Sequence, residues 1–143
     1  MVEKGLFILW EKARSKEKEI MSDIALHFDV LETFTIDLGN KFLEIIEDFY
    51  DHNIPPNENK AEKCGDGEFL VVVVRDNNAA YDYRETLRAK KIVEVNFFDA
   101  KKRYRKMANP LDPYCIVVHG TNSKQEFEHD YVYLNKLRGN HHA

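Results

Sequence analysis

The chain contains, near its end, the segment Val117-Val118-His119-Gly120-Thr121-Asn122-Ser123. The apolar, β-branched run over residues 115–119 is typical of a strand, and the three residues after it are typical of a turn. Ser123-Lys124-Gln125-Glu126 matches a capping box, which predicts that a helix starts there. The segment therefore places His119 at the end of a strand, directly before a capped helix, where binding and catalytic residues are often found.

His119 and Asp130 form a candidate catalytic pair. The predicted helix has Phe127, Tyr131 and Leu134 as its buried stripe, and Asp130 lies at the edge of that stripe. Its carboxylate can therefore point back toward the strand end and hold the imidazole in one tautomer, which a nucleophilic or acid–base histidine requires. Two alternatives stay open: a lone histidine is more often structural, and Asp130 can equally be an exposed carboxylate.

The rest of the chain alternates strand-like and helix-like segments. We predict strands over residues 6–10, 28–36, 68–74 and 115–119, with 68–74 as a central strand because its β-branched residues run without alternation. We predict helices from about residue 15, over 42–49, 79–89 and 98–107, and from 123, with a polar loop at 53–67. Such alternation favours a parallel doubly wound sheet. However, the sequence has neither a GxGxxG nor a GxxxxGK[ST] phosphate loop.

Length and composition indicate one domain over residues 1–143, with 137–143 as a flexible tail, because 143 residues at 43% hydrophobic content suffice for a single core. The longest apolar run, residues 69–74, is too short to span a bilayer, and the start has no signal-peptide pattern. We therefore expect a cytoplasmic protein without a membrane partner. The two cysteines, Cys64 and Cys115, lack ligand spacing, so we expect free thiols.

The charge of the chain is unevenly distributed. The formal net charge of −4 argues against binding of extended nucleic acid. However, residues 84–106 hold nine basic side chains against three acidic ones, which makes this segment +6 and the remainder −10. Such a segment is either a solvated helix face or a binding site for a small anion such as phosphate.

The segment around His119 resembles the hallmark of the nucleoside diphosphate kinase family, a strand ending Asn-x-x-His-Gly-Ser-Asp-Ser before a helix that carries a glutamate. His119 takes the place of the phosphorylated histidine, and Asp130 that of the glutamate which orients it. Phe49-Tyr50-Asp51-His52 resembles the family's His-Tyr-x-x-His segment, so Tyr50 corresponds to the tyrosine near the active histidine. Order and spacing agree from residue 6 to about 137.

The resemblance also assigns the phosphate-binding residues. Arg84 takes the place of a phosphate-binding arginine, with Gly67 and Asn78 similar in type to residues of the same stretch in the family. The family's Lys-Pro-Asp is Trp10-Glu11-Lys12-Ala13 here, so Lys12 would supply the active-site lysine after a shift of one residue. Arg105 or Lys101 would serve as the second arginine. Ile116 replaces the asparagine that contacts the nucleotide sugar.

The resemblance implies an α+β fold, a ferredoxin-like βαββαβ antiparallel sheet with added helices, in place of the parallel sheet. It implies a phosphotransferase that carries a phosphate on His119, assembles into a homo-oligomer, and uses Mg²⁺ carried by a nucleoside di- or triphosphate. No protein-only metal site is expected, because His129 and Asp130 are consecutive on a helix and cannot both face one point with His119. The alternatives are a catalytically degenerate nucleotide- or phosphate-binding or assembly module, and a histidine-dependent phosphate-ester hydrolase.

Overall fold

The computed structural model describes residues 1–50, 60–86 and 89–141. Its main sheet has four strands, β1 (Glu3–Leu9), β2 (Asp29–Ile36), β3 (Phe69–Asp76) and β6 (Val118–Gly120), in the order β2-β3-β1-β6. Every neighbouring pair is antiparallel; β1 pairs with β3 from Glu3 opposite Asp76 to Leu9 opposite Leu70. The antiparallel ferredoxin-like order implied by the resemblance is thus confirmed.

The expectation of a parallel sheet, based on alternation alone, is wrong. The helix after β1 leads to β2, which runs parallel to β1, but β3 lies between these two strands and is antiparallel to both. The connection from β3 to β6 likewise joins two strands that have β1 between them. Alternation of strands and helices predicts crossover connections. It does not show whether another strand lies between the two strands that a crossover joins.

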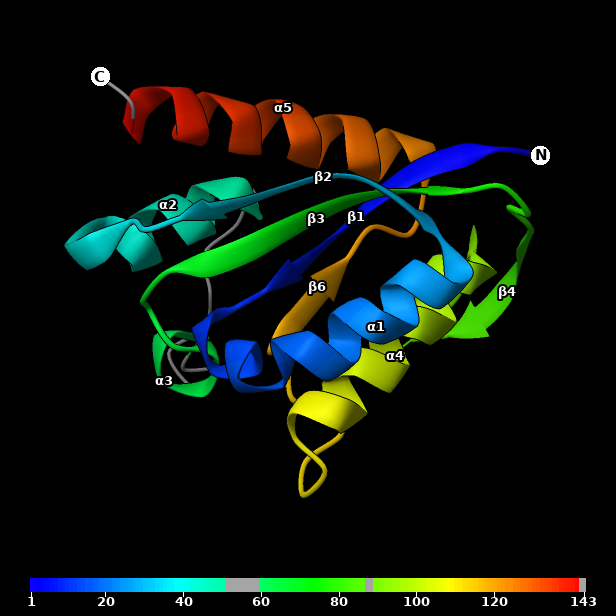
Figure 1. Cartoon of the computed structure of the whole chain (residues 1–143), viewed down its shortest axis with the longest axis horizontal. Coiled ribbons are helices and arrows are strands. Elements are labelled where there is room, and N and C mark those ends of the chain that lie inside the picture. The colour runs from blue at the N-terminus through cyan, green and yellow to red at the C-terminus, as the bar shows by residue number, and fades with distance from the viewer. Residues whose placement is uncertain (51–59, 87–88, 142–143) are drawn as a thin grey trace.

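Helices cover both faces of the sheet (Figure 1). The helices α1 (Glu17–His27) and α4 (Val95–Ala108) lie on one face, and α2 (Phe42–Phe49) and α5 (Lys124–His141) lie on the other. Side chains of β1 alternate between the two cores: Leu6 and Ile8 pack with the second pair of helices, while Phe7 and Leu9 pack with the first. The inner strand β3 is buried along almost its whole length, as its uninterrupted apolar run predicted.

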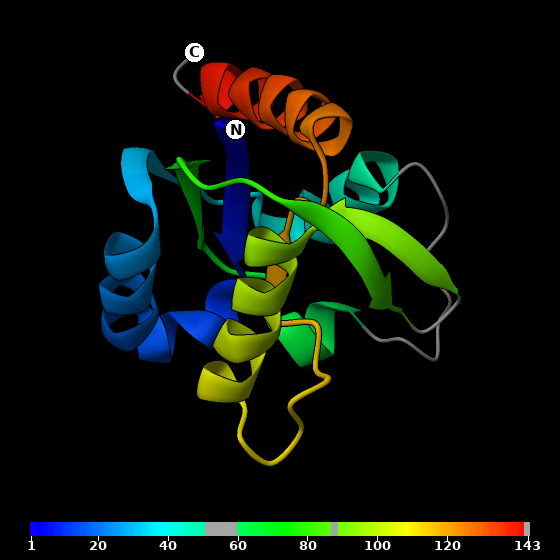
Figure 2. The same ribbon diagram turned by 90° about the vertical axis from the view of Figure 1, so that its right-hand side faces the viewer.

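The helix predicted over residues 79–89 is wrong. Residues of this segment form β4 (Tyr81–Glu85), which pairs with β5 (Lys90–Glu94) as a separate two-stranded sheet that projects beside α4 (Figure 2). The Asp76 carboxylate accepts a hydrogen bond from the backbone N–H of Asn78 at 2.9 Å, so Asp76-Asn77-Asn78 makes a turn instead of capping a helix. Alternating Tyr81 and Tyr83 then suit a strand better than a helix.

Smaller differences concern the ends of elements. The helix predicted at 98–107 starts at Val95, because the Glu94 side chain accepts from the Asn96 N–H at 2.8 Å and caps it. The strand predicted at 115–119 starts only at Val118. The tail predicted for 137–143 is helical as far as His141. The predicted polar loop contains α3 (Lys60–Cys64), and residues 51–59 lie outside the described residues.

Two short 3₁₀ turns complete the described structure, η1 (Glu11–Lys16) after β1 and η2 (Gly39–Lys41) before α2. None of the described helices combines the length and the apolar character needed to cross a membrane.

Candidate active site around His119

His119 lies on β6, opposite Ile8 of β1, and its side chain points to the helix that follows. Its Nε2 lies 2.8 Å from Oδ2 of Asp130 on α5, and the side chains of these two residues are 13% and 5% exposed. A carboxylate can only accept a hydrogen bond, so Nε2 carries the proton and the lone pair remains on Nδ1. The structure therefore joins the two residues that the sequence paired.

The Asp130 carboxylate is itself held in place. Its other oxygen, Oδ1, lies 2.8 Å from Nδ1 of His129. The start of α5 is fixed by the backbone N–H of Glu126, which donates to Oγ of Ser123 at 3.2 Å, as the capping box predicted. The orientation of Asp130 is thus set by a capped helix and a neighbouring imidazole, which leaves its Oδ2 directed at His119.

Tyr50 closes the other side of the imidazole. Its hydroxyl lies 3.3 Å from Nδ1 of His119 and donates to the lone pair there. Burial raises the pKa of the Tyr50 phenol, and the negative charge of Asp130 adds to the rise, so Tyr50 remains a proton donor at neutral pH. The ring of Phe49 meets His119 edge-on at a centroid distance of 5.6 Å. The imidazole is therefore fixed at both nitrogens and packed against an aromatic ring.

Two cations on α4 contact residues close to His119 in the chain. Lys101 is 8% exposed, and its ammonium donates to Oδ1 of Asn122 at 3.2 Å. Burial, with a contribution from the charge of Arg105, lowers the pKa of Lys101 to about 8. Arg105 donates from Nε to the Val118 carbonyl at 2.8 Å, and burial lowers its pKa as well. Within residues 1–50, 60–86 and 89–141, neither cation forms a salt bridge with a carboxylate.

Gly120 allows the side chain of Lys101 to pack closely against β6. A Cβ atom at residue 120 would lie 3.2 Å from Cβ of Lys101 and 3.2 Å from Cδ1 of Phe7. These separations are tighter than ordinary van der Waals contact, so a larger residue would push α4 away from β6. The glycine after the histidine therefore serves the packing of the cation as well as the turn.

Two predicted phosphate-binding residues contact other groups. Arg84 on β4 forms a paired contact with Asp99 of α4, with Nε–Oδ1 and Nη2–Oδ2 distances of 3.0 Å. Lys12 on η1 donates to the backbone carbonyl of Glu62 on α3. The structure thus brings together His119, Asp130 and Tyr50 with Lys101 and Arg105, and it gives Arg84 and Lys12 partners outside that group.

Sequence reasoning assigned Glu126 only a capping role, yet its Oε1 lies 4.0 Å from Nε2 of His119. Burial raises the pKa of this carboxyl, against the opposing charges of His119 and Lys101. The signal was present in the sequence, because Glu126 and Asp130 are four residues apart and share one helix face. Lys101 and Arg105 have the same spacing on α4.

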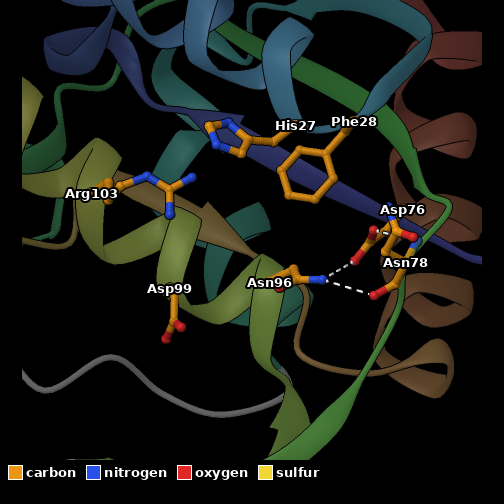
Figure 3. A pocket seen from close by; sticks show the side chains of 7 residues that line it. All are labelled: His27, Phe28, Asp76, Asn78, Asn96, Asp99 and Arg103. Carbon is orange, nitrogen blue, oxygen red and sulfur yellow. Dashed lines mark hydrogen bonds between the residues drawn. The ribbon is translucent and has the colours of Figure 1, made fainter.

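A separate cavity of about 220 Å³ does not include His119 (Figure 3). Its Asn96 Nδ2 donates to Oδ2 of Asp76 at 2.8 Å and to the Asn78 carbonyl at 3.0 Å, so these lining groups already bond to one another. The cavity is lined by His27, Phe28, Asp76, Asn78, Asn96, Asp99 and Arg103. The mutual pairing of its polar groups makes it a weaker candidate site than the cluster around His119.

No protein-family model and no curated protein matches the chain. Solved structures do match. A nucleoside diphosphate kinase from Aquifex aeolicus is 14% identical and aligns over 94% of this chain and 95% of its own length, with a TM-score of 0.59. The enzyme from Encephalitozoon cuniculi is 12% identical over 92% of this chain and 87% of its own, with a TM-score of 0.60. The fold is that of the nucleoside diphosphate kinases.

A nucleoside diphosphate kinase family protein from Babesia bovis also matches, at 7% identity over 92% of this chain and 86% of its own, with a TM-score of 0.54. The α+β, ferredoxin-like fold that the motif around His119 implied is confirmed by these likenesses and by the strand order. At such low identity a shared fold carries no activity with it. What the chain does must therefore be argued from its own site.

Proposed function

We propose that the chain is a phosphotransferase of the nucleoside diphosphate kinase type, which moves the terminal phosphate of a nucleoside triphosphate through a phosphohistidine at His119. One observation supports this best: next to an imidazole with a held proton on Nε2, a buried cation, Lys101, donates to Asn122 and a half-buried one, Arg105, donates to the Val118 carbonyl. Neither forms a salt bridge with a carboxylate among the described residues. Cations that are largely shielded from water and form no salt bridge favour an anionic ligand.

In the first half-reaction, the Tyr50 hydroxyl would give up its hydrogen bond to Nδ1 of His119, and the freed lone pair would attack the terminal phosphorus of the donor. The Nδ1–P bond forms while the bond from phosphorus to the leaving diphosphate oxygen breaks, and that oxygen keeps the electron pair. The ring then carries a positive charge, with the Nε2 proton still hydrogen-bonded to Asp130. The carboxylate 2.8 Å away stabilises this charge and keeps Nδ1 aimed at the phosphorus.

In the second half-reaction, a terminal oxygen of the acceptor diphosphate attacks the phosphorus and the Nδ1–P bond breaks, which returns the electron pair to the ring. In phosphoryl transfer, a protein contributes mainly by aligning the reacting groups and stabilising the charge on the phosphate oxygens. Lys101 and Arg105 would supply positive charge to the phosphate oxygens. The Tyr50 hydroxyl, which lies next to Nδ1, would donate a hydrogen bond to one of these oxygens. Mg²⁺ bound to the nucleotide phosphates would neutralise further charge, as is usual for this ion.

The experiment is incubation of the chain with Mg-ATP, followed by intact-mass measurement. We expect a mass gain of one phosphate that is lost in acid and is absent from His119→Ala. His27→Ala is a matched control, because His27 is a half-exposed histidine on α1 and should leave labelling unchanged. Failure of every nucleoside triphosphate to label the protein would contradict the proposal.

A second candidate is a phosphate- or nucleotide-binding module without transfer activity. It is favoured by the pairing of Arg84 with Asp99 and by Ile116 at the place of the sugar-contacting asparagine. Calorimetry would then show nucleotide binding, and Lys101→Met would lower the affinity. Incubation with Mg-ATP would leave no labelled histidine. Release of free phosphate during the same incubation would instead indicate a hydrolase.

The proposal includes a homo-oligomer, as the family resemblance implies, and a cytoplasmic location. Sedimentation analysis of the full chain checks the first. A single species with the mass of the 16.8 kDa monomer would contradict it.

A further inference from the structure

Three metal-ligating atoms converge where β6 meets α5. Nε2 of His119, Oε1 of Glu126 and an oxygen of Asp130 all lie within 4.8 Å of one another. The distance from Nε2 of His119 to Oδ2 of Asp130 is 2.8 Å, and to Oε1 of Glu126 it is 4.0 Å. The strand end thus supplies one ligand, and a single face of the helix supplies the other two.

The surroundings of these atoms resemble those of a binding site more than those of an exposed acidic patch. The Asp130 side chain is 5% exposed and that of His119 is 13% exposed, while Glu126 is the outermost at 36%. His129 holds the second oxygen of Asp130 at 2.8 Å, and a hydrogen bond of this kind fixes a ligating carboxylate. Two carboxylates also match the charge of a divalent ion.

We propose that His119, Glu126 and Asp130 form a binding site for one divalent transition-metal ion of the Zn²⁺ class. One imidazole nitrogen with two carboxylate oxygens suits zinc, whereas magnesium and calcium prefer oxygen ligands alone. Zinc bonds of about 2.0–2.2 Å place neighbouring ligand atoms about 3.3–3.6 Å apart in a tetrahedron. The observed 2.8 Å and 4.0 Å separations bracket that value. A water would complete the coordination on the side toward solvent.

Binding of the ion displaces a proton. Nε2 gives its proton to solvent, and the metal takes the place of the Nε2–H···Oδ2 hydrogen bond, because a ligating imidazole must offer a lone pair. Lys101 limits the affinity, since its positive charge acts on Glu126 and opposes the incoming cation. His129 is not a member of this group; Glu126, one turn before Asp130, lies close enough to be the third ligand.

The consequence for catalysis rests on the proposed function. With the ion on Nε2, Asp130 is neutralised and the ring loses electron density, so Nδ1 becomes a poorer nucleophile toward phosphorus. His119 would then bind the metal ion or carry the phosphate, but not both at once. Zinc would act as an inhibitor of labelling that competes for His119, while Mg²⁺ remains on the nucleotide.

The test is calorimetric titration of the full chain with Zn²⁺ in the absence of nucleotide, together with Co²⁺ titration followed by visible absorption. We expect one site per chain and a Co²⁺ absorption band of a four- or five-coordinate ion. Glu126→Gln should weaken binding by about tenfold or more, and His119→Ala should abolish the band. Glu128→Gln is the matched control, because Glu128 is an exposed residue on the same helix.

Absence of a one-site isotherm, or binding that His119→Ala and Glu126→Gln leave unchanged, would overturn the inference; the latter result would assign the metal to other histidines. The outcome is separate from that of the proposed function. Phosphohistidine without zinc binding would reject only the metal site. Zinc binding without phosphohistidine would reject only the transferase. The Glu126 side chain is partly exposed, so Glu126→Gln should fold and can test the metal site even where His119→Ala does not fold.

Discussion

The Asp130 carboxylate lies 2.8 Å from Nε2 of His119, and this contact determines which imidazole nitrogen is available for chemistry. Because the acceptor is on the Nε2 side, the lone pair faces Tyr50 on the Nδ1 side. A histidine fixed in this way has a single lone pair with one defined direction. The first prediction tests the carboxylate.

Asp130→Asn should slow formation of phosphohistidine by on the order of 100-fold or more, because an amide neither stabilises the positive ring nor imposes the tautomer. Rapid-quench labelling with Mg-ATP measures the rate. The similar size of asparagine should leave the thermal unfolding curve close to that of the parent chain. An unaltered labelling rate would remove the orienting role of Asp130.

Lys101 gives the second prediction, a pH profile. Its pKa is lowered from 10.5 to about 8 by burial, so the ammonium is present below pH 8 and is lost as the pH rises through that value. Labelling, measured as kcat/KM, should fall above about pH 8. Lys101→Arg should move this fall to higher pH, and Lys101→Met should lower kcat/KM by about 100-fold at pH 7. A profile that is the same for all three proteins would exclude Lys101 from the site.

Glu94 provides a prediction on stability. It is fully buried, and burial together with Asp76 raises its pKa from 4.5 to about 8. The folded chain therefore binds this proton more tightly than the unfolded chain does, and the free energy of unfolding falls as the pH rises from about 4.5 to 8. Glu94→Gln keeps the acceptor for the Asn96 N–H but cannot ionise.

The Glu94→Gln chain should consequently be more stable than the parent at pH 8, by on the order of a few kcal/mol, and similar to it at pH 4.5. Urea unfolding at pH 4.5, 6 and 8 measures the difference. Parallel stability profiles for the two chains would show that folding does not raise the pKa of Glu94.

A fourth prediction compares two arginines. Arg84→Met removes a partly exposed contact with Asp99 and should leave nucleotide binding and labelling within about twofold of the parent values. Arg105→Met removes a half-buried cation near Tyr50 and should weaken nucleotide binding at least tenfold, a factor of the size typical of charge-assisted hydrogen bonds. Equal effects of the two changes, measured by calorimetry, would place Arg84 in the binding site.

The local part of the site could be predicted from the sequence. His119 and Asp130 belong to one strand, turn and helix in immediate succession, so periodicity and a capping signal sufficed to bring them together. The strand order was not predictable in this way, because it depends on β3 lying between β1 and β2. It followed instead from the resemblance of the motif around His119 to a family of known fold.

The cations were harder to assign. Four basic residues were candidates for phosphate binding, and only the packing of α4 against β6 separates Lys101 and Arg105 from the others. Arg84 was placed on a predicted helix, but the segment is a strand in a hairpin, and its side chain contacts Asp99. Side-chain partners across distant elements are set by tertiary contacts that local pattern does not encode.

The three residues around Nε2 of His119 all come from positions 119–130, whereas both cations come from α4. The proposed reactive group and the proposed anion-binding charges are therefore supplied by separate segments of the chain. A designer can graft the first onto another antiparallel sheet edge followed by a capped helix. Exchange of Lys101 or Arg105 on α4 would alter the anion-binding charges, and it would also remove their contacts with Asn122 and with the Val118 carbonyl.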